Sequence, residues 1–460
     1  TSKFPPNCGV VSSTTFDIAP DVAKPDTTAD LAIFLRPPPE VSIAKNTSSL
    51  ATVDISDKSP TATELKFVPS AINKLPAVLV PIVISSPDTV RSPSTIKLPE
   101  LSNFNPENTL DTKEIRKLDP FSIYALTTAS EAILMSGLDS DTCNQDRIGV
   151  TIGTGIGGIQ TLEAQHTLIN EKGSRRVSPQ FVPKMIANIA GGHIAMKWGL
   201  RGPNQTVTSA CASATDAIGM AMRTIRSGDA DVMITGGTEA SITPLCIAGF
   251  ANMKALSQSC SDPEKASRPF EANRDGFVLG EGSGMIVIES EEHAINRGAE
   301  ILVELAGYGS TDDAFHITQP APQGLGAKKA MENAINDARL NLTDIDYINA
   351  HGTSTKFNDL NETLAIQNLF KEHSKELKVS STKSMTGHLL GAAGAIEAIA
   401  TIKTILKKNI PPTINYETPD PECSLNYVPN KNQKHSVKAA LSNTFGFGGH
   451  NAVLCFKEYI

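Results

Sequence analysis

Several features are scarce or missing in this chain of 460 residues, and each absence excludes a class of protein. No apolar run approaches the roughly 18 residues that a transmembrane helix needs. The seven cysteines form no C-x-x-C pair, no metal-ligand spacing and no dense disulfide pattern, which favours a reducing compartment. Positive charge is not in excess, since the formal net charge is −8, so a chain-wide nucleic-acid surface is not expected.

A secretory start is also missing, because the chain opens at Thr1 without a basic-then-apolar stretch. The first residues are too acidic and too poor in arginine for a typical transit peptide. Together with the cysteine pattern, this predicts a cytoplasmic protein, with a plastid or a mitochondrion as alternatives.

Glycine is almost absent from residues 1–95, which hold one of the 33 glycines but 13 of the 29 prolines. Serine and threonine are also frequent there, and this composition is typical of segments that do not pack a core. We expect residues 1–95 to be largely disordered. The segment is a linker, an unusual extension or a corrupted reading of the original gene.

From about residue 96 the sequence alternates between strand-like and helix-like stretches, which favours an α/β fold with mostly parallel sheets. Buried strands are predicted at residues 147–152, 232–235, 284–288 and 347–350. Helices are predicted at residues 112–136 and 326–341. We divide this part into two halves, residues 96–300 and residues 301–460.

Cys211 follows a short β-like stretch and precedes small helix-forming residues. A helix N-terminus carries partial positive charge, so we expect a lowered thiol pKa and a reactive thiolate. His351 and His388 lie in two further polar loops rich in glycine and threonine. One cysteine and two histidines of this kind indicate nucleophilic thiol chemistry on an acyl group.

Four motifs carry a resemblance to a known family. They are TSACAS at 208–213, HGTST at 351–355, KSMTGH at 383–388 and NTFGFGG at 443–449. In order and spacing they resemble the elongating β-ketoacyl-[acyl-carrier-protein] synthases of the thiolase-like superfamily, most closely the synthase II branch. The resemblance covers roughly residues 96–460. It implies a five-layered α-β-α-β-α fold made of two similar halves.

The resemblance implies a role for each polar residue of these motifs. Cys211 would be the nucleophile, and the backbone N–H groups of Cys211 and Phe447 would stabilise the oxyanion. His351 and His388 would donate hydrogen bonds to the malonyl thioester carbonyl. Lys383 would orient His388 through a hydrogen-bond network and add positive charge.

Substrate-binding residues also follow from the resemblance. Thr353 and Thr355 would contact the phosphopantetheine arm, and Ile156 and Phe250 would line the acyl pocket, with Phe447 as a gate. The run GTGIGG at 153–158 formally fits the dinucleotide-binding pattern G-x-G-x-x-G. We reject that interpretation, because the same segment matches the pocket-lining turn of the family.

Lys113, Arg116 and Lys117 stand at i, i+3 and i+4, so we expect them on one helical face. A local basic patch attracts an acidic partner even when the net charge is negative. By resemblance these residues, with Lys254, would dock the acyl carrier protein.

The resemblance therefore implies a 3-oxoacyl-[acyl-carrier-protein] synthase of type II fatty acid elongation. The resemblance implies a homodimer without metal or organic cofactor, since the phosphopantetheine belongs to the acyl carrier protein; we expect neither a nucleic-acid nor a membrane partner. Three alternatives stay open. They are a ketosynthase of polyketide assembly, a non-catalytic partner subunit like a chain-length factor, and an inactive product of a damaged gene, because the first strand of the family fold is not recognisable.

Overall fold

The structure is a computed structural model that describes residues 104–138, 143–259 and 262–460. The disorder predicted for residues 1–95 lies outside the described residues. All residues predicted above for the site lie inside them. In this part of the chain no helix is both long and apolar enough to cross a membrane.

The first of two main sheets has the strand order β2-β1-β3-β4. Its strands are β1 (Ile148–Gly153), β2 (Asn204–Val207), β3 (Val232–Glu239) and β4 (Gly282–Glu289). β1 runs parallel to β2 and β3, with Ile152 opposite both Thr206 and Gly236, and β4 is antiparallel to β3. Every residue of β1 and β3 is buried, as expected of strands covered on both faces.

The second main sheet has the order β5-β11-β10-β6-β7. Its strands are β5 (Val303–Asp312), β6 (Tyr347–Asn349), β7 (Lys378–Ser380), β10 (Ala439–Phe445) and β11 (His450–Glu458), and a separate pair joins β8 (Asn409–Ile410) to β9 (Gln433–Lys434). β6 is parallel to β7 and β10, whereas β11 is antiparallel to β5 and β10. The sheets are therefore mixed rather than mostly parallel, because β4 and β11 join their sheets in the antiparallel direction.

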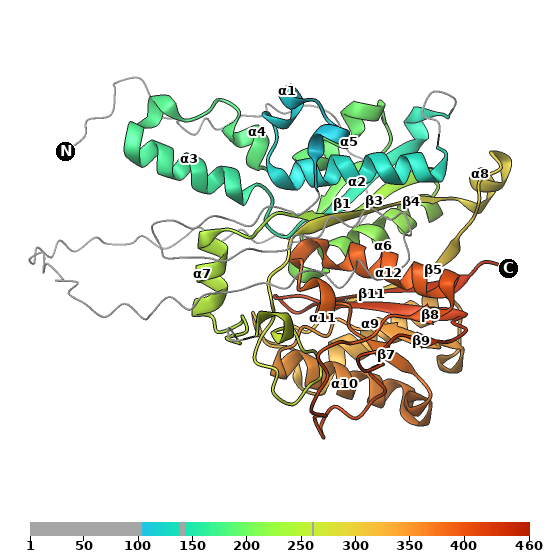
Figure 1. Cartoon of the computed structure of the whole chain (residues 1–460). Helices are drawn as coiled ribbons and strands as arrows, with labels where there is room; N and C mark the ends of the chain where they lie inside the picture. The colour runs from blue at the N-terminus through green and yellow to red at the C-terminus, as the bar shows by residue number, and fades with distance from the viewer. Residues whose placement is uncertain (1–103, 139–142, 260–261) are drawn as a thin grey trace, which may run out of the picture. The chain divides into compact units, whose positions relative to one another are not determined.

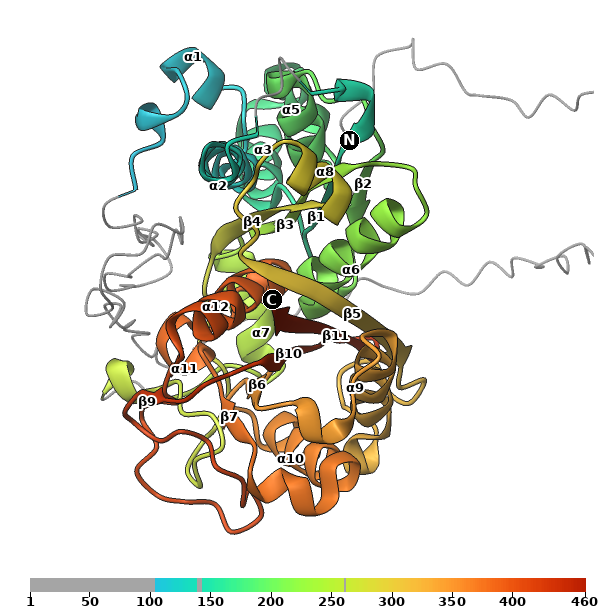
Figure 2. The ribbon, with the colours of Figure 1, turned by 90° about the vertical axis from the view of Figure 1, so that its right-hand side faces the viewer.

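Helices cover both faces of both sheets (Figures 1 and 2). α6 (Ser213–Arg226) and α12 (Ala393–Lys407) lie between the sheets and contact each other. α2 (Pro120–Ser136) and α5 (Ile189–Trp198) cover the outer face of the first sheet, and α9 (Leu325–Asp337) and α10 (Lys356–Phe370) cover the second. This is the predicted α-β-α-β-α order, so the fold class is confirmed.

Buried hydrophobic side chains fill the spaces between these layers. Leu126, Ile152 and Ile194 pack between the first sheet and its outer helices. Ala334 and Ile348 belong to the corresponding core on the outer side of the second sheet. The central helices α6 and α12 meet the second sheet through a further cluster. Burial on this scale stabilises the layered arrangement by about 25 cal/mol for each Å² of apolar surface removed from water.

The helix predicted at residues 112–136 is interrupted. α1 (Thr112–Ile115) ends before Arg116, and α2 begins at Pro120. Proline disfavours helical backbone in the preceding residue but suits the first helical position, and the Asp119 side chain caps the new helix at the Phe121 N–H. The second predicted helix, 326–341, is α9 and ends at Asp337.

The remaining helices lie in the connections. They are α3 (Ile159–Lys172), α4 (Phe181–Met185), α7 (Pro244–Asn252), α8 (Glu291–Asn296) and α11 (Lys383–Thr386).

The two halves repeat one local device. A 3₁₀ turn over Ala210–Ala212 leads into α6, and a 3₁₀ turn over Leu390–Ala392 leads into α12. Each turn opens on a residue in the left-handed region, Ala210 with φ 50° and Leu390 with φ 48°. Each half therefore presents a strained turn at the N-terminus of a central helix.

Candidate active site

Cys211 lies in the middle of the turn that precedes α6. The turn is tied down on both sides, because the Ser209 N–H donates to Ser213 Oγ at 3.0 Å and Ser213 Oγ donates to the Ala210 carbonyl at 2.6 Å. Cys211 is 7% exposed. The sequence prediction of a strand-to-helix turn at this cysteine is confirmed.

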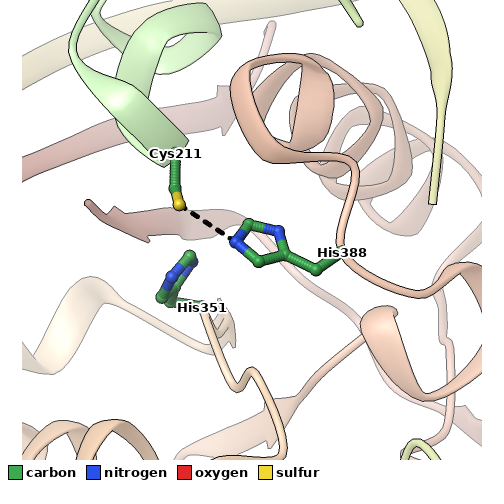
Figure 3. Close-up of side chains that lie close together, drawn as sticks. All are labelled: Cys211, His351 and His388. Carbon is green, nitrogen blue, oxygen red and sulfur yellow. Dashed lines mark hydrogen bonds between the residues drawn. The ribbon is translucent and has the colours of Figure 1, made fainter. Parts of the chain in front are cut away.

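His351 and His388 come from the second half and meet Cys211 (Figure 3). His388 Nε2 lies 3.0 Å from Cys211 Sγ. The two imidazole rings meet edge to face, with centroids 5.3 Å apart. Each histidine has a glycine with positive φ beside it, Gly352 at 34° and Gly387 at 69°, a conformation that side chains with a Cβ disfavour.

Both imidazoles are held neutral. Burial lowers the pKa of His351 and His388 well below the usual range, and the positive charge of Lys383 acts in the same direction. A neutral imidazole has one N–H donor and one acceptor nitrogen. The pair therefore offers directed hydrogen bonds rather than positive charge.

Lys383 is buried and forms an ion pair with Glu397, 14 residues later on α12. Among the described residues, no hydrogen bond joins Lys383 to His388. Burial raises the pKa of Glu397 to about 7, and Lys383 opposes this. The described part of the structure thus pairs Lys383 with Glu397 and shows no direct hydrogen bond by which it would orient His388.

Phe447 is half-buried beside the nucleophile, and its backbone N–H is within hydrogen-bonding reach of the Cys211 sulfur. The flanking Gly446 approaches closely, since a Cβ at this position would lie 2.8 Å from the Ser209 carbonyl oxygen. The backbone of the 446–449 loop therefore lies where a donor to developing negative charge is needed.

The thiol pKa expected from the sequence is wrong. Burial raises the pKa of Cys211 to about 11, while Lys383 and the Phe447 N–H act in the opposite direction. The sequence placed a helix N-terminus at the sulfur but gave no measure of burial, and desolvation of the charged form outweighs the favourable charges here. At neutral pH the Cys211 side chain is therefore a thiol.

This burial predicts a steep pH dependence of alkylation. Between pH 7 and pH 9 the thiolate fraction rises about tenfold for each pH unit, because this range lies below the raised pKa. The rate of Cys211 modification by iodoacetamide should rise in the same proportion, measured by peptide mass spectrometry with Cys211→Ala as the blank. A rate that levels off below pH 8 would show that the thiolate is already formed.

One cavity of about 360 Å³ brings most of the predicted residues together. Its lining contains Cys211, His351, His388, Thr353, Thr355, Ile156, Phe250, Phe447 and Lys254. Thr353 Oγ1 and Thr355 Oγ1 are 3.0 Å apart. Phe250 contacts Phe277, and Phe277 in turn meets the His388 ring edge-on at 5.3 Å.

Lys113, Arg116 and Lys117 are exposed and lie outside this cavity lining. They do not share one helical face as predicted, because α1 ends at Ile115 and Arg116 and Lys117 belong to the turn before α2. The Lys184 Nζ donates to the Arg116 carbonyl at 2.7 Å, so a further lysine joins this surface.

Sequence reasoning missed the buried carboxylates around the site. Glu362 accepts the N–H of His351 at 2.9 Å and of Gly352 at 2.8 Å, and burial raises its pKa to about 7. Glu239 accepts the N–H groups of Gly155 and Gly391, at 2.7 and 3.0 Å. A single glutamate in a polar stretch is usually solvated, so no sequence signal marked either residue.

The donor set could also suit a metal ion. The ligand atoms of Cys211, His351 and His388 all lie within 4.8 Å of one another. Coordination at about 2.0–2.3 Å would require the thiol to lose its proton. The raised pKa of Cys211 makes that loss unfavourable at neutral pH.

Comparisons with known proteins agree with this geometry. The β-ketoacyl synthase N-terminal domain model matches residues 72–294, and the C-terminal domain model matches residues 302–417. The first match begins upstream of residue 96, where we placed the start of the resemblance.

Two curated relatives are named 3-oxoacyl-[acyl-carrier-protein] synthase 2. The protein of Staphylococcus aureus (strain COL) is 53% identical over 360 residues, which cover 78% of this chain and 87% of that protein. The protein of Synechocystis sp. is 51% identical over 360 residues, with 78% and 86% covered.

A solved structure is similar as well. It contains a type II polyketide synthase acyl-carrier protein in complex with its ketosynthase bound to the hexaketide. The TM-score is 0.71 at 35% identity, and 74% of this chain and 85% of that chain are covered. With two domain models matched over most of its length and a relative at 53% identity over 78% of the chain, the chain belongs to the β-ketoacyl synthase family.

Proposed function

We propose that the chain is a 3-oxoacyl-[acyl-carrier-protein] synthase that extends acyl chains by two carbons in type II fatty acid elongation. The observation that carries the proposal is the contact of His388 Nε2 with Cys211 Sγ at 3.0 Å, with His351 beside them in one cavity. Relatives named 3-oxoacyl-[acyl-carrier-protein] synthase 2 at 51% and 53% identity support it.

In the first step the Cys211 sulfur attacks the thioester carbonyl of an acyl carrier protein. The carbonyl oxygen becomes an oxyanion, which the backbone N–H groups of Cys211 and Phe447 stabilise. The bond to the pantetheine sulfur breaks, and the proton of the Cys211 thiol ends on that sulfur. His388 Nε2 lies 3.0 Å from Cys211 Sγ, so it is placed to stabilise negative charge on the sulfur as the proton leaves.

In the second step malonyl-carrier protein loses carbon dioxide. The electrons of the broken carbon–carbon bond form an enolate, whose oxygen accepts hydrogen bonds from the N–H groups of His351 and His388. The enolate carbon attacks the acyl group on Cys211. The Cys211 sulfur then departs as a thiolate and takes up a proton from solvent. Thr353 and Thr355 hold the pantetheine arm, and Ile156 and Phe250 line the space for the acyl chain, with Phe447 as gate.

The direct test is condensation by the purified full chain with acyl- and malonyl-carrier protein. The expected product is a 3-oxoacyl-carrier protein two carbons longer, formed with one carbon dioxide per turnover, as measured by mass spectrometry and carbon dioxide release. A folded wild-type protein that forms no product would contradict the proposal and favour a non-catalytic subunit or a damaged N-terminal part.

The ketosynthase bound to a hexaketide favours a second candidate, a polyketide-type ketosynthase. The two functions differ in the number of condensations made without reduction. With malonyl-carrier protein in excess and no reductase, a fatty acid synthase stops after one addition, whereas a polyketide ketosynthase continues. The mass of the product on the carrier protein separates them.

We propose that the reaction needs no metal or organic cofactor of the protein. Both steps above use thiol, imidazole and backbone groups only. Dialysis against a chelator should therefore leave the condensation rate unchanged. A loss of activity that zinc or magnesium restores would contradict this part of the proposal.

The exposed lysine at the cavity rim, Lys254, supports a docking role for the acyl carrier protein. Lys254→Glu is expected to raise the KM for carrier substrates about tenfold with little change in kcat, because rim charges act mainly on association. Added salt should raise the KM for carrier substrates more in the wild-type protein than in the variant. Lys431→Glu, at an exposed lysine outside the cavity lining, is the control, and equal effects of both substitutions would contradict the assignment.

The docking proposal extends to Lys113, Arg116 and Lys117.

We further propose a cytoplasmic homodimer. β2 stands at the edge of its sheet with Asn204 and Gln205 exposed, and an unpaired strand edge is suited to pairing with a second copy. Light scattering after gel filtration would give the mass of the assembly, and a monomer at micromolar concentration would contradict it.

A further inference from the structure

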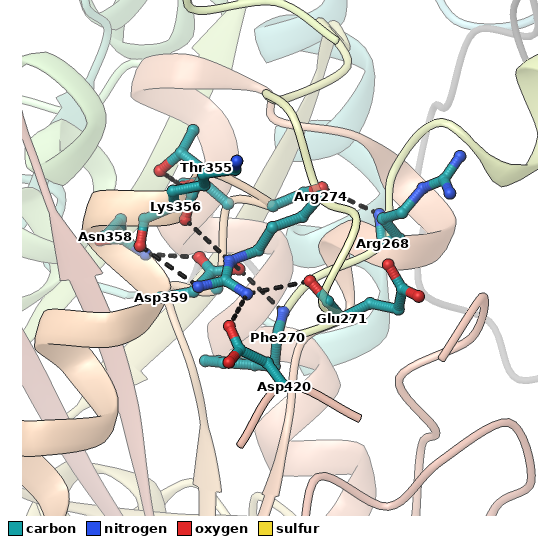
Figure 4. A network of polar contacts seen from close by, with 12 residues as sticks. Arg268, Phe270, Glu271, Arg274, Thr355, Lys356, Asn358, Asp359 and Asp420 are labelled. Atoms are coloured by element: carbon teal, nitrogen blue, oxygen red, sulfur yellow. Dashed lines mark hydrogen bonds and ion pairs between the residues drawn. The ribbon is translucent and has the colours of Figure 1, made fainter. Parts of the chain in front are cut away.

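Arg274 is a buried cation that the chemistry above does not use. Its side chain is 4% exposed and lies between two carboxylates (Figure 4). Nη1 is 2.6 Å from Asp420 Oδ2, and Nε is 3.5 Å from Asp359 Oδ2. Asp359 is itself fully buried. Buried charges are costly unless they are paired, so the contacts of Arg274 indicate what the residue does.

The guanidinium also donates to three backbone carbonyls. Nη1 contacts the Glu271 oxygen at 2.9 Å within its own segment. Nε and Nη2 contact the carbonyls of Thr355 and Lys356, each at 3.3 Å. A planar fork of five N–H donors fits several acceptors at fixed angles, which a lysine ammonium does not. Arg274 thus fixes the backbone where the 353–355 loop enters α10.

Asp359 extends the same network to the other side of the loop. It accepts the backbone N–H of Phe270 at 2.8 Å and that of Thr353. Ser354, between the two threonines, has a φ of 68°. Its carbonyl accepts the Gly276 N–H at 3.0 Å, and its Oγ accepts the Arg268 N–H at 3.0 Å. The segment 268–276 and Asp359 therefore hold all three residues of the loop together, with Ser354 in the strained left-handed region.

The same segment continues into the cavity. Phe277 meets the His388 ring edge-on, and its backbone exchanges hydrogen bonds with Ala255 and Ser257, next to Lys254. Arg274 therefore lies where the threonine loop, the His388 wall and the cavity rim are joined, yet it is absent from the cavity lining.

We propose that Arg274 is a positioning residue for the loop Thr353–Thr355, and that it acts on binding of the phosphopantetheine arm without touching it. The inference rests on the proposed function. If it holds, loss of the guanidinium weakens productive binding of every pantetheine thioester but spares the intrinsic reactivity of Cys211.

The test is Arg274→Lys in the full chain. We expect the KM for both acyl- and malonyl-carrier protein to rise about tenfold, with kcat changed by less than about threefold. Alkylation of Cys211 by iodoacetamide needs no pantetheine and should stay within about twofold of wild type. Equal losses in KM, kcat and alkylation would mean a general structural role and would overturn the inference.

Thr355→Val, alone and combined with Arg274→Lys, gives a second readout. If Arg274 acts through the loop, the two effects on KM are less than multiplicative, and multiplicative effects would overturn the inference. Arg297→Lys is the matched control, since Arg297 pairs with Glu289 and donates to the Ser136 carbonyl outside the cavity lining. Its KM values should equal those of wild type, and a rise like that of Arg274→Lys would overturn the inference.

Should Arg274→Lys fail to fold, the double variant Arg274→Met with Asp359→Asn removes the positive charge of Arg274 together with the negative charge of Asp359. This pair should fold and show the same rise in KM, and a wild-type KM would overturn the inference. Absence of condensation by the wild-type protein would contradict the proposed function instead, while the alkylation rates would still report on Cys211.

Discussion

Replacement of Cys211 by alanine is expected to abolish condensation, with a loss on the order of 10³-fold or more, as is found when a catalytic nucleophile is removed. The sulfur is the atom that carries the acyl group between the two carrier proteins in the proposed reaction. Without it, no acyl-enzyme forms, and the enolate from malonyl-carrier protein has no acyl group to attack. The methyl group of alanine fills part of the same buried space, so the fold should be retained.

The measurement is product formation together with intact-protein mass. Wild-type protein given acyl-carrier protein alone should gain the mass of one acyl group, and Cys211→Ala should gain none. Cys246→Ala, at a half-buried cysteine on α7, is the matched control and should behave as wild type. Acylation of the Cys211→Ala protein would place the nucleophile elsewhere.

The two histidine substitutions are expected to differ by reaction step. His351→Ala should leave acylation of Cys211 nearly intact but lower condensation by about 10²- to 10³-fold, the usual cost of removing one donor to a developing oxyanion. His388→Ala should lower condensation as much and also slow acylation, because His388 is the histidine whose Nε2 lies within hydrogen-bond distance of the Cys211 sulfur.

Acyl-enzyme formation followed by mass, and carbon dioxide release from malonyl-carrier protein, separate the two steps. His351→Gln and His388→Asn return an amide N–H and should recover part of the activity if donation is the role. The double alanine variant should lose less than the product of the single losses, since both groups serve one oxygen. Identical defects of both single variants in acylation would contradict the division of roles.

Much of the candidate site could be predicted from the sequence because its residues stand in motifs with glycine beside them. Cys211, His351 and His388 are separated by up to 177 residues, yet each is identified by its local motif. One cavity unites them with Thr353, Thr355, Ile156, Phe250, Phe447 and Lys254. The sequence shows which local segments need glycine beside a reactive residue, and the fold then brings these segments together around one cavity.

The parts that could not be predicted depend on burial across elements. Glu362 and Glu397 stand in helices, and the sequence does not tell that both are nearly inaccessible and contact the histidine motifs, Glu362 at the His351 N–H and Glu397 at Lys383. The predicted lowering of the Cys211 pKa was wrong for the same reason, since desolvation is a property of the packed interior. The helical face predicted for Lys113, Arg116 and Lys117 is absent because α1 ends at Ile115 and a separate helix begins at Pro120.

The repeated turn before the two central helices sets a stoichiometry. Gly391 follows Leu390 just as Cys211 follows Ala210, so it occupies the position in the second half that the nucleophile holds in the first. A Cβ at Gly391 would lie 2.2 Å from the Gly155 nitrogen and 2.6 Å from Glu239 Oε2, so no side chain fits there. In the proposed reaction this architecture carries a single acyl group per chain, and its second half serves the first as the source of the imidazoles.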